Sequence, residues 1–135
     1  MREKPITEVT LRKYEPAGSD FNTNIRRFLL SLGLIRPGDK DSPVEMILKT
    51  VLTYGKPVAI RDLAKQTGIS ESGVRYHVLR LKTMRLIEGH GKYQIAEGDL
   101  SLAFKIFRKY ALEDVLDRIS DYAEKLTSPE STNLD

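Results

Sequence analysis

The stretch DLAKQTGISESGVRYHVLRLKTMRLIEGHGKYQI, residues 62–95, decides the fold of this chain. Two helices that meet at a steep angle need a small residue where their backbones cross, and Ala64 supplies it. Gly68 tolerates the positive φ of a tight turn, and Ser70 is placed to accept from the free N–H groups of the next helix. That helix carries an apolar stripe at helical spacing, formed by Val74, Val78 and Leu81. These residue types at these spacings predict a helix-turn-helix unit.

A further helix is expected before this unit, over residues 43–54. Ser42 is a natural N-cap, Pro43 suits the first helical position, and Glu45 is placed to close a capping box. Gly55 ends the apolar pattern.

Short strands are expected on both sides of the unit. Residues 58–60 form an apolar run that suits an edge strand or an extended entry to the next helix. Residues 86–88 and 93–95 suit two further strands, with the tight turn Gly89-His90-Gly91-Lys92 between them. The fold class is therefore mainly α with a small β-hairpin.

The N-terminal part is expected to form an arm followed by a helix. Residues 1–19 read as the arm, with a short strand over 6–14, where Ile, Val, Thr, Leu and Tyr are frequent. Asp20 or Asn22 would cap a helix that ends near Leu32. The predicted organisation is an N-terminal arm and helix (1–42), a central domain (43–96), a C-terminal helix (97–127) and a flexible tail (128–135).

A long helical pattern starts after Asp99 and reaches about Leu126. Apolar residues recur in it every three or four positions, at Leu112, Val115 or Leu116, Ile119, Tyr122 or Ala123, and Leu126. The acidic residues outside this stripe predict that the helix points away from nucleic acid. Two interpretations remain open: a helix that pairs with its mate in a homodimer, or one that folds back on its own core with a break near Tyr110.

Composition excludes several classes of protein. The chain has 135 residues, 40% of them apolar, which suits one domain with a real core. It has no cysteine, so disulfides, thiolate metal sites and thiol-based sensing are excluded. No apolar run approaches a membrane span, and the N-terminus lacks the apolar region of a secretory signal. A soluble, cytoplasmic protein is expected.

Charge is unevenly distributed. The net charge is +3, yet residues 56–95 hold eight Lys/Arg against three Asp/Glu, and residues 96–135 hold five against nine. A basic middle segment therefore adjoins an acidic C-terminal segment. The middle segment suits a polyanion.

With the apolar stripe inside, the opposite face of the second helix carries polar and cationic residues. Arg75 is suited to a guanine edge or a phosphate. Tyr76 offers a flat apolar body and a hydroxyl, and Ser72 is a natural phosphate ligand. Arg80 and Lys82 continue this face one or two turns further on.

Residues 43–95 resemble the winged helix-turn-helix domain of the broad ArsR/MarR type of prokaryotic transcriptional regulators. The string that carries the resemblance is LAKQTGISESGVRYHVLRLKTMRLIE, followed by a short hairpin. The resemblance implies that the second helix of the unit reads the major groove of DNA and that the hairpin is a wing against the adjacent backbone. It places His90 and Lys92 at the tip of the wing.

One departure from the family pattern is Arg85, which stands where the family usually has glycine between the third helix and the wing. A left-handed backbone there costs about 1 kcal/mol more for Arg than for Gly. Either the corner is built differently, or Arg85 binds a phosphate. The candidate DNA-binding residues are Ser70, Ser72, Arg75, Tyr76, Arg80, Lys82, Arg85, His90 and Lys92.

Enzymatic chemistry is not expected. There is no Gly-rich phosphate loop, nucleophile elbow or HExxH motif. The two histidines lie 13 residues apart on different elements, so neither a metal site nor a cofactor is predicted.

The sequence thus favours a transcriptional regulator that binds double-stranded DNA as a homodimer, with one recognition helix per half-site. The alternative is a winged helix that acts as a protein–protein module in a transcription or chromosome-maintenance complex. A small-molecule sensor is a third option, for which the sequence carries no signature.

Overall fold

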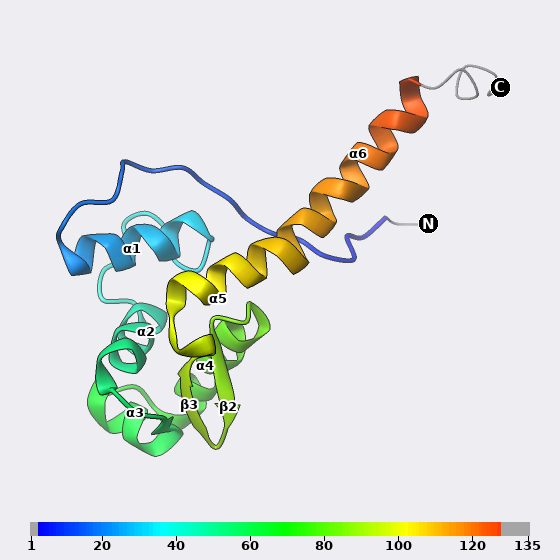
Figure 1. Cartoon of the computed structure of the whole chain (residues 1–135). Helices are drawn as coiled ribbons and strands as arrows, with labels where there is room; N and C mark the ends of the chain where they lie inside the picture. The colour runs from blue at the N-terminus through cyan, green and yellow to red at the C-terminus, as the bar shows by residue number, and fades with distance from the viewer. Residues whose placement is uncertain (1–2, 128–135) are drawn as a thin grey trace.

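Helices dominate the computed structural model, which describes residues 3–127 (Figure 1). The elements in chain order are α1 (Phe21–Ser31), α2 (Pro43–Tyr54), β1 (Val58–Ala59), α3 (Ile60–Thr67), α4 (Glu71–Thr83), β2 (Ile87–His90), β3 (Lys92–Ile95), α5 (Leu100–Phe107) and α6 (Glu113–Thr127). The prediction of a mainly helical protein with a small β-hairpin is confirmed. The predicted tail, 128–135, lies outside the described residues.

The three strands form one antiparallel sheet in the order β1-β3-β2. Ile87 pairs with Ile95 and His90 with Lys92 in the hairpin, while Val58 of β1 pairs with Tyr93 on the other side of β3. The predicted edge strand is therefore confirmed for Val58–Ala59, whereas Ile60 already belongs to α3. The strand ties the entry of α3 to the hairpin.

One hydrophobic core joins α1, α2, α3, α4 and the hairpin. Its largest fully buried side chains include Leu29, Ile47, Leu48, Leu63, Leu81, Leu86 and Ile87. Val74, Val78 and Leu81 are all buried, which confirms the predicted inner stripe of α4. Burial of each such side chain contributes roughly 1.5–3 kcal/mol to folding.

Local signals place both ends of α1. The carboxylate of Asp20, rather than the side chain of Asn22, accepts from the backbone N–H of Thr23 at 2.8 Å. At the other end Gly33 has a φ of 71°, and the N–H of Leu34 donates to the carbonyl of Leu29 at 2.9 Å. This pair of features is a glycine-ended helix terminus.

The predicted strand over 6–14 is wrong, because no residue between 3 and 19 belongs to a strand. A strand needs a neighbouring strand for its backbone groups, and residues 3–19 pair with none. Instead the N–H of Arg12 donates to the carbonyl of Ser31 at the end of α1, and Tyr14 packs against the core.

The capping box predicted for α2 is also wrong, although the helix has the expected bounds. The hydroxyl of Ser42 makes no capping hydrogen bond and is buried without a partner. Glu45 turns instead toward Arg26 of α1, with 3.6 Å between carboxylate and guanidinium. This ion pair links α1 to α2, a contact that no local pattern in α2 indicates.

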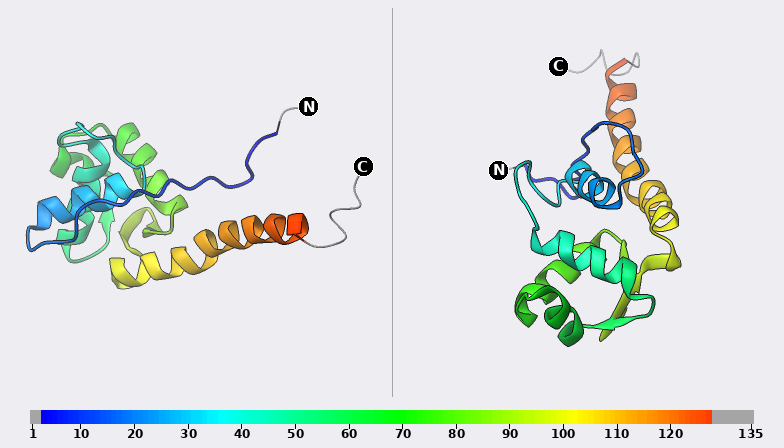
Figure 2. Two further views of the ribbon diagram at one scale, coloured as in Figure 1. Left: turned by 90° about the horizontal axis from the view of Figure 1, so that it is seen from above. Right: turned by 90° about the vertical axis from the view of Figure 1, so that its left-hand side faces the viewer.

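The C-terminal helix runs from Leu100 to Thr127 without a break. A π-helical turn, Arg108–Leu112, joins α5 to α6 where a break was considered. Asp99 caps the start of α5 by accepting from the N–H of Ser101. The side chains of Ala103 and Phe107 are buried, whereas α6 has no buried residue and extends beyond the body, away from the hairpin tip (Figures 1 and 2).

None of the helices between residues 3 and 127 combines the length and the apolar character that a membrane span requires.

Candidate nucleic-acid interface

The turn between α3 and α4 has the geometry that its sequence predicts. Gly68 adopts a φ of 76°, and its N–H donates to the carbonyl of Ala64 at 2.9 Å. The hydroxyl of Thr67 donates to the carbonyl of Leu63 at 2.7 Å, and Ile69 packs against the core. The turn therefore fixes the direction in which α4 leaves α3.

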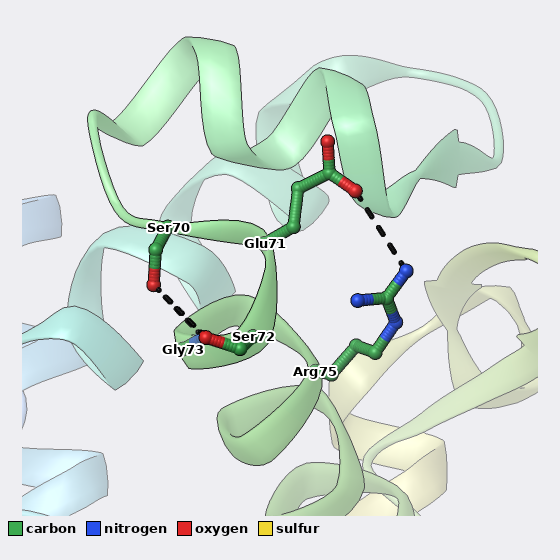
Figure 3. Close-up of polar contacts among 5 residues, drawn as sticks. All are labelled: Ser70, Glu71, Ser72, Gly73 and Arg75. Atoms are coloured by element: carbon green, nitrogen blue, oxygen red, sulfur yellow. Dashed lines mark hydrogen bonds and ion pairs between the residues drawn. The ribbon is translucent and has the colours of Figure 1, made fainter.

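The N-terminus of α4 is closed by Ser70, whose hydroxyl accepts from the N–H of Gly73 at 3.1 Å. The hydroxyl oxygens of Ser70 and Ser72 lie 3.3 Å apart (Figure 3). A Cβ at Gly73 would come within 2.9 Å of the Cγ2 of Ile69 and 3.1 Å of the Ser70 hydroxyl. Glycine at 73 thus allows the cap and the turn residue to close on the helix.

The first turns of α4 present three of the predicted residues to solvent. Ser72, Arg75 and Tyr76 are exposed, with 64% of the Arg75 side chain and 61% of Tyr76 accessible. Glu71 holds Arg75 in an exposed ion pair at 3.7 Å, one helical turn apart (Figure 3). Such exposed pairs contribute little to stability, so the guanidinium can exchange this partner for a phosphate.

Arg80 does not point outward as predicted. Its guanidinium donates to the carbonyl of Leu34 at 3.0 Å and reaches Nδ1 of His77 at 3.2 Å. It also lies 5.8 Å from the ring of Tyr76. Helical spacing alone placed Arg80 on the free face, but the segment after α1 folds against that part of α4 and supplies an acceptor.

His77 shares this arrangement. Because a guanidinium has no acceptor, Nδ1 of His77 accepts from Arg80, which requires the neutral ring. Partial burial, followed by the charge of Arg80, lowers the pKa of His77 below its ordinary value of 6.5. The ring packs edge to face on Tyr76 with centroids 4.9 Å apart. Arg80 and His77 together therefore position Tyr76.

Lys82 is also turned inward, contrary to the prediction. Its ammonium donates to the carbonyl of Gly89 at 3.0 Å and lies 5.7 Å from the ring centre of Tyr93. The lysine thus connects α4 to both strands of the hairpin. It positions the hairpin relative to α4 rather than offering a free charge.

Arg85 adopts the left-handed backbone, with a φ of 58°. Its N–H donates to the carbonyl of Lys82 at 2.8 Å, and the N–H of Leu86 donates to that of Leu81 at 3.0 Å. This is the usual two-bond helix terminus with arginine in the place that glycine normally takes. The corner is therefore built in the ordinary way, and the side chain of Arg85 is exposed.

The hairpin is tighter than the predicted four-residue turn. His90 and Lys92 pair with one another, so only Gly91 separates the strands. Gly89 has a φ of 132°, and a Cβ there would collide with the carbonyl oxygen of Lys92. Both predicted tip residues, His90 and Lys92, are exposed.

The exposure of Leu79 was not predicted from the sequence. This residue lies one turn after Arg75 and Tyr76, and 63% of it is exposed. Helical spacing from Arg75 would have identified this position, but an apolar residue was not expected outside. The free face of α4 is consequently part apolar, with Arg75 as its cation.

Comparison of the chain with protein-family models, with curated proteins and with solved structures finds no match. Between residues 3 and 127, no group of three or more His, Asp or Glu side chains is placed to hold a metal ion.

Proposed function

We propose that this protein is a winged-helix regulator of transcription that binds double-stranded DNA, with α4 as its recognition helix and β2–β3 as its wing. The observation that carries the proposal is the exposure of Ser72, Arg75 and Tyr76 on the first turns of a helix whose direction is fixed by a glycine turn. In helix-turn-helix proteins these turns of the second helix reach base edges in the major groove.

Exposed cations on neighbouring elements support phosphate contacts. Arg85 follows α4, and Lys92 lies at the hairpin tip. Arg61 and Lys65 are exposed on α3, the helix that crosses the DNA backbone in this motif. The exposed side chains of Ser70, Ser72 and His90 add polar groups that can donate hydrogen bonds. Arg80 and Lys82 contribute indirectly, by holding Tyr76 and the hairpin in place.

The same proposal includes a homodimer through α6. Leu116, Ile119, Tyr122 and Leu126 form an exposed apolar stripe on a helix with no buried residue. An apolar stripe at this spacing packs against a second helix. Two-fold pairing would present one α4 per half-site, with half-sites about 34 Å apart along the duplex.

The second candidate is a protein–protein module, and the free face of α4 favours it in one respect. Tyr76 and Leu79 are both more than half exposed, with Arg75 as the cation of that face. Aromatic and apolar residues around an arginine are also the composition of a protein interface.

Binding to a random-sequence 30-base-pair duplex, measured by fluorescence anisotropy at several salt concentrations, separates the two candidates. We expect binding at micromolar protein in low salt, and a weaker salt dependence for Arg75→Gln, with the slope reduced by about 0.9 if one phosphate contact is lost. The matched control is Lys105→Gln, which removes an exposed charge from α5. Absence of binding at low salt, or equal behaviour of the two variants, contradicts DNA recognition by α4.

A further inference from the structure

A groove of about 510 Å³ lies between the N-terminal arm, α1 and α5, away from the residues assigned to DNA. Arm residues 11–17 form one wall, α1 forms the floor, and Phe104 of α5 closes the other side. This volume is within the range of sites for small organic ligands, roughly 300–1,000 Å³.

The arm wall is held in place at both ends. At one end the N–H of Arg12 donates to the carbonyl of Ser31 at 2.9 Å. At the other end the amide of Asn24 donates to the carbonyl of Gly18 at 2.8 Å and accepts from its N–H at 3.1 Å. Arg27 adds a bond to the carbonyl of Pro16 at 3.3 Å. The groove is therefore bounded by an ordered wall.

The interior of the groove is mainly apolar and partly aromatic. The rings of Phe28 and Phe104 meet edge to face with centroids 6.1 Å apart, and Tyr14, Leu11 and Leu32 extend the apolar lining. Both phenylalanine rings are only partly buried. An apolar ligand would therefore remove more of their surface from water, which favours binding.

Charged residues in the lining are predominantly cationic. Arg12, Lys13 and Arg27 contribute three positive charges, against the single carboxylate of Glu15. Within residues 3–127, the side chains of Arg12 and Lys13 make no hydrogen bond or ion pair. A ligand that fits both parts of the lining has an apolar body and one anionic group.

We infer that this groove binds a small amphiphilic carboxylate, with its apolar part against Phe28 and Phe104 and its carboxylate toward Arg12 and Lys13. A carboxylate accepts from an arginine or lysine through charge-assisted hydrogen bonds. The inference does not rest on the proposed DNA binding, and it is tested without DNA.

The bound ligand would contact both α1, which belongs to the core, and α5, from which α6 extends. Occupancy would thus connect the arm, the core and the base of the apolar α6 helix. This position suits an effector that changes how α6 is held, because a ligand shifts an equilibrium by its differential contacts with the two states.

Isothermal titration calorimetry of the full chain tests the inference with three probes: decanoate, 2-naphthoate and decyltrimethylammonium. We expect one or both carboxylates to bind at least tenfold more tightly than the cation of equal chain length. The tighter of the two carboxylates then identifies an alkyl or an aryl ligand. Failure of both carboxylates to bind at least tenfold more tightly than decyltrimethylammonium, or no binding of either carboxylate at millimolar concentration, overturns the inference.

Variants and amide chemical shifts locate the site. The double variant Arg12→Gln/Lys13→Gln, on the exposed arm, should weaken carboxylate binding about tenfold, the effect expected for loss of one charge-assisted bond. Lys105→Gln, an exposed lysine of α5 outside the groove, should bind like the parent. Shift changes at Phe28, Leu32 and Phe104 support the groove, whereas changes confined to Leu116, Ile119 and Tyr122 assign the probe to α6 and contradict it.

Discussion

The guanidinium of Arg80 donates to the carbonyl oxygen of Leu34 at 3.0 Å, across 46 positions of the chain. This bond joins α4 to the segment that follows α1. It also leaves Arg80 positioned to donate to Nδ1 of His77, so that the ring of Tyr76 has neighbours on its inner side.

Replacement of Arg80 by alanine should therefore reduce stability. A partly buried hydrogen bond from a charged donor contributes about 1.5–3 kcal/mol, and we expect Arg80→Ala to lower the free energy of unfolding by roughly that amount in urea titrations. Arg75→Ala on the exposed face is the control and should change it by no more than about 0.5 kcal/mol. Equal effects of the two substitutions contradict the contacts described for Arg80.

Acidification should destabilise the protein through His77. Partial burial, and to a smaller extent the charge of Arg80, lower the pKa of His77 in the folded state. Below pH 6.5 the imidazole is therefore protonated more readily in the unfolded chain than in the folded one. This contribution to stability is complete above pH 6.5 and is lost as the pH falls toward the folded pKa. Urea titrations between pH 7.5 and 5 should show that loss in the parent and a smaller loss in His77→Gln. The control is His90→Gln, which should show the same dependence of unfolding free energy on pH as the parent. If His77→Gln also loses as much stability as the parent on acidification, the prediction is contradicted.

Substitution of Arg85 separates backbone strain from phosphate binding. Arg85→Gly should raise the free energy of unfolding by about 1 kcal/mol, because glycine adopts the observed φ of 58° without strain. Arg85→Ala removes the same charge and keeps the strain, so it should show no such gain. If Arg85 binds a phosphate, both variants reduce the salt slope of DNA binding by about 0.9. A gain in stability for alanine as large as for glycine would show that strain is not the cause.

The two hairpin glycines should respond differently to substitution. Gly89→Ala places a Cβ against the carbonyl of Lys92 at a strained φ, and we expect a loss of at least roughly 2 kcal/mol in the free energy of unfolding. Gly91 also has a positive φ, of 76°, but nothing lies within 4 Å of its Cβ position. Asparagine tolerates the left-handed region, so Gly91→Asn should lower stability by less than about 1 kcal/mol. Thermal unfolding followed by circular dichroism measures both effects. If Gly89→Ala is as stable as the parent, the hairpin geometry is contradicted.

A charge within the α6 stripe should prevent the proposed dimer. Ile119 is 56% exposed in the single chain, so Ile119→Lys leaves the core intact and places a charge at the centre of the helix pair. Sedimentation at tens of micromolar protein should show a dimer for the parent and a monomer for this variant. Asp117→Lys, on the polar face of the same helix, should remain dimeric. A monomeric parent protein contradicts dimerisation through α6.

The secondary structure and the helix-turn-helix unit could be predicted from the sequence, because caps, turn glycines and apolar periodicity act between residues three or four positions apart. Gly68 and Ser70 make their contacts with Ala64 and Gly73, all within one short segment. Helical periodicity likewise predicted the buried stripe of α4, formed by Val74, Val78 and Leu81. The capping box predicted at Ser42 does not form, because the carboxylate of Glu45 forms an ion pair with Arg26 of α1 instead.

The exposure of the first turns of α4 was predictable from the sequence, but the contacts of its later cations were not. Helical spacing identified Ser72, Arg75 and Tyr76 as exposed, and they are. It could not show that Arg80 and Lys82 are bound by carbonyl oxygens of Leu34 and Gly89, since those acceptors reach α4 only when distant segments pack. Nor could it reveal the groove beneath the arm. Contacts within one helical turn depend on the spacing of residues in the sequence, which can be read directly. The partners of long side chains depend on which distant segments pack beside them, and only the tertiary structure decides that.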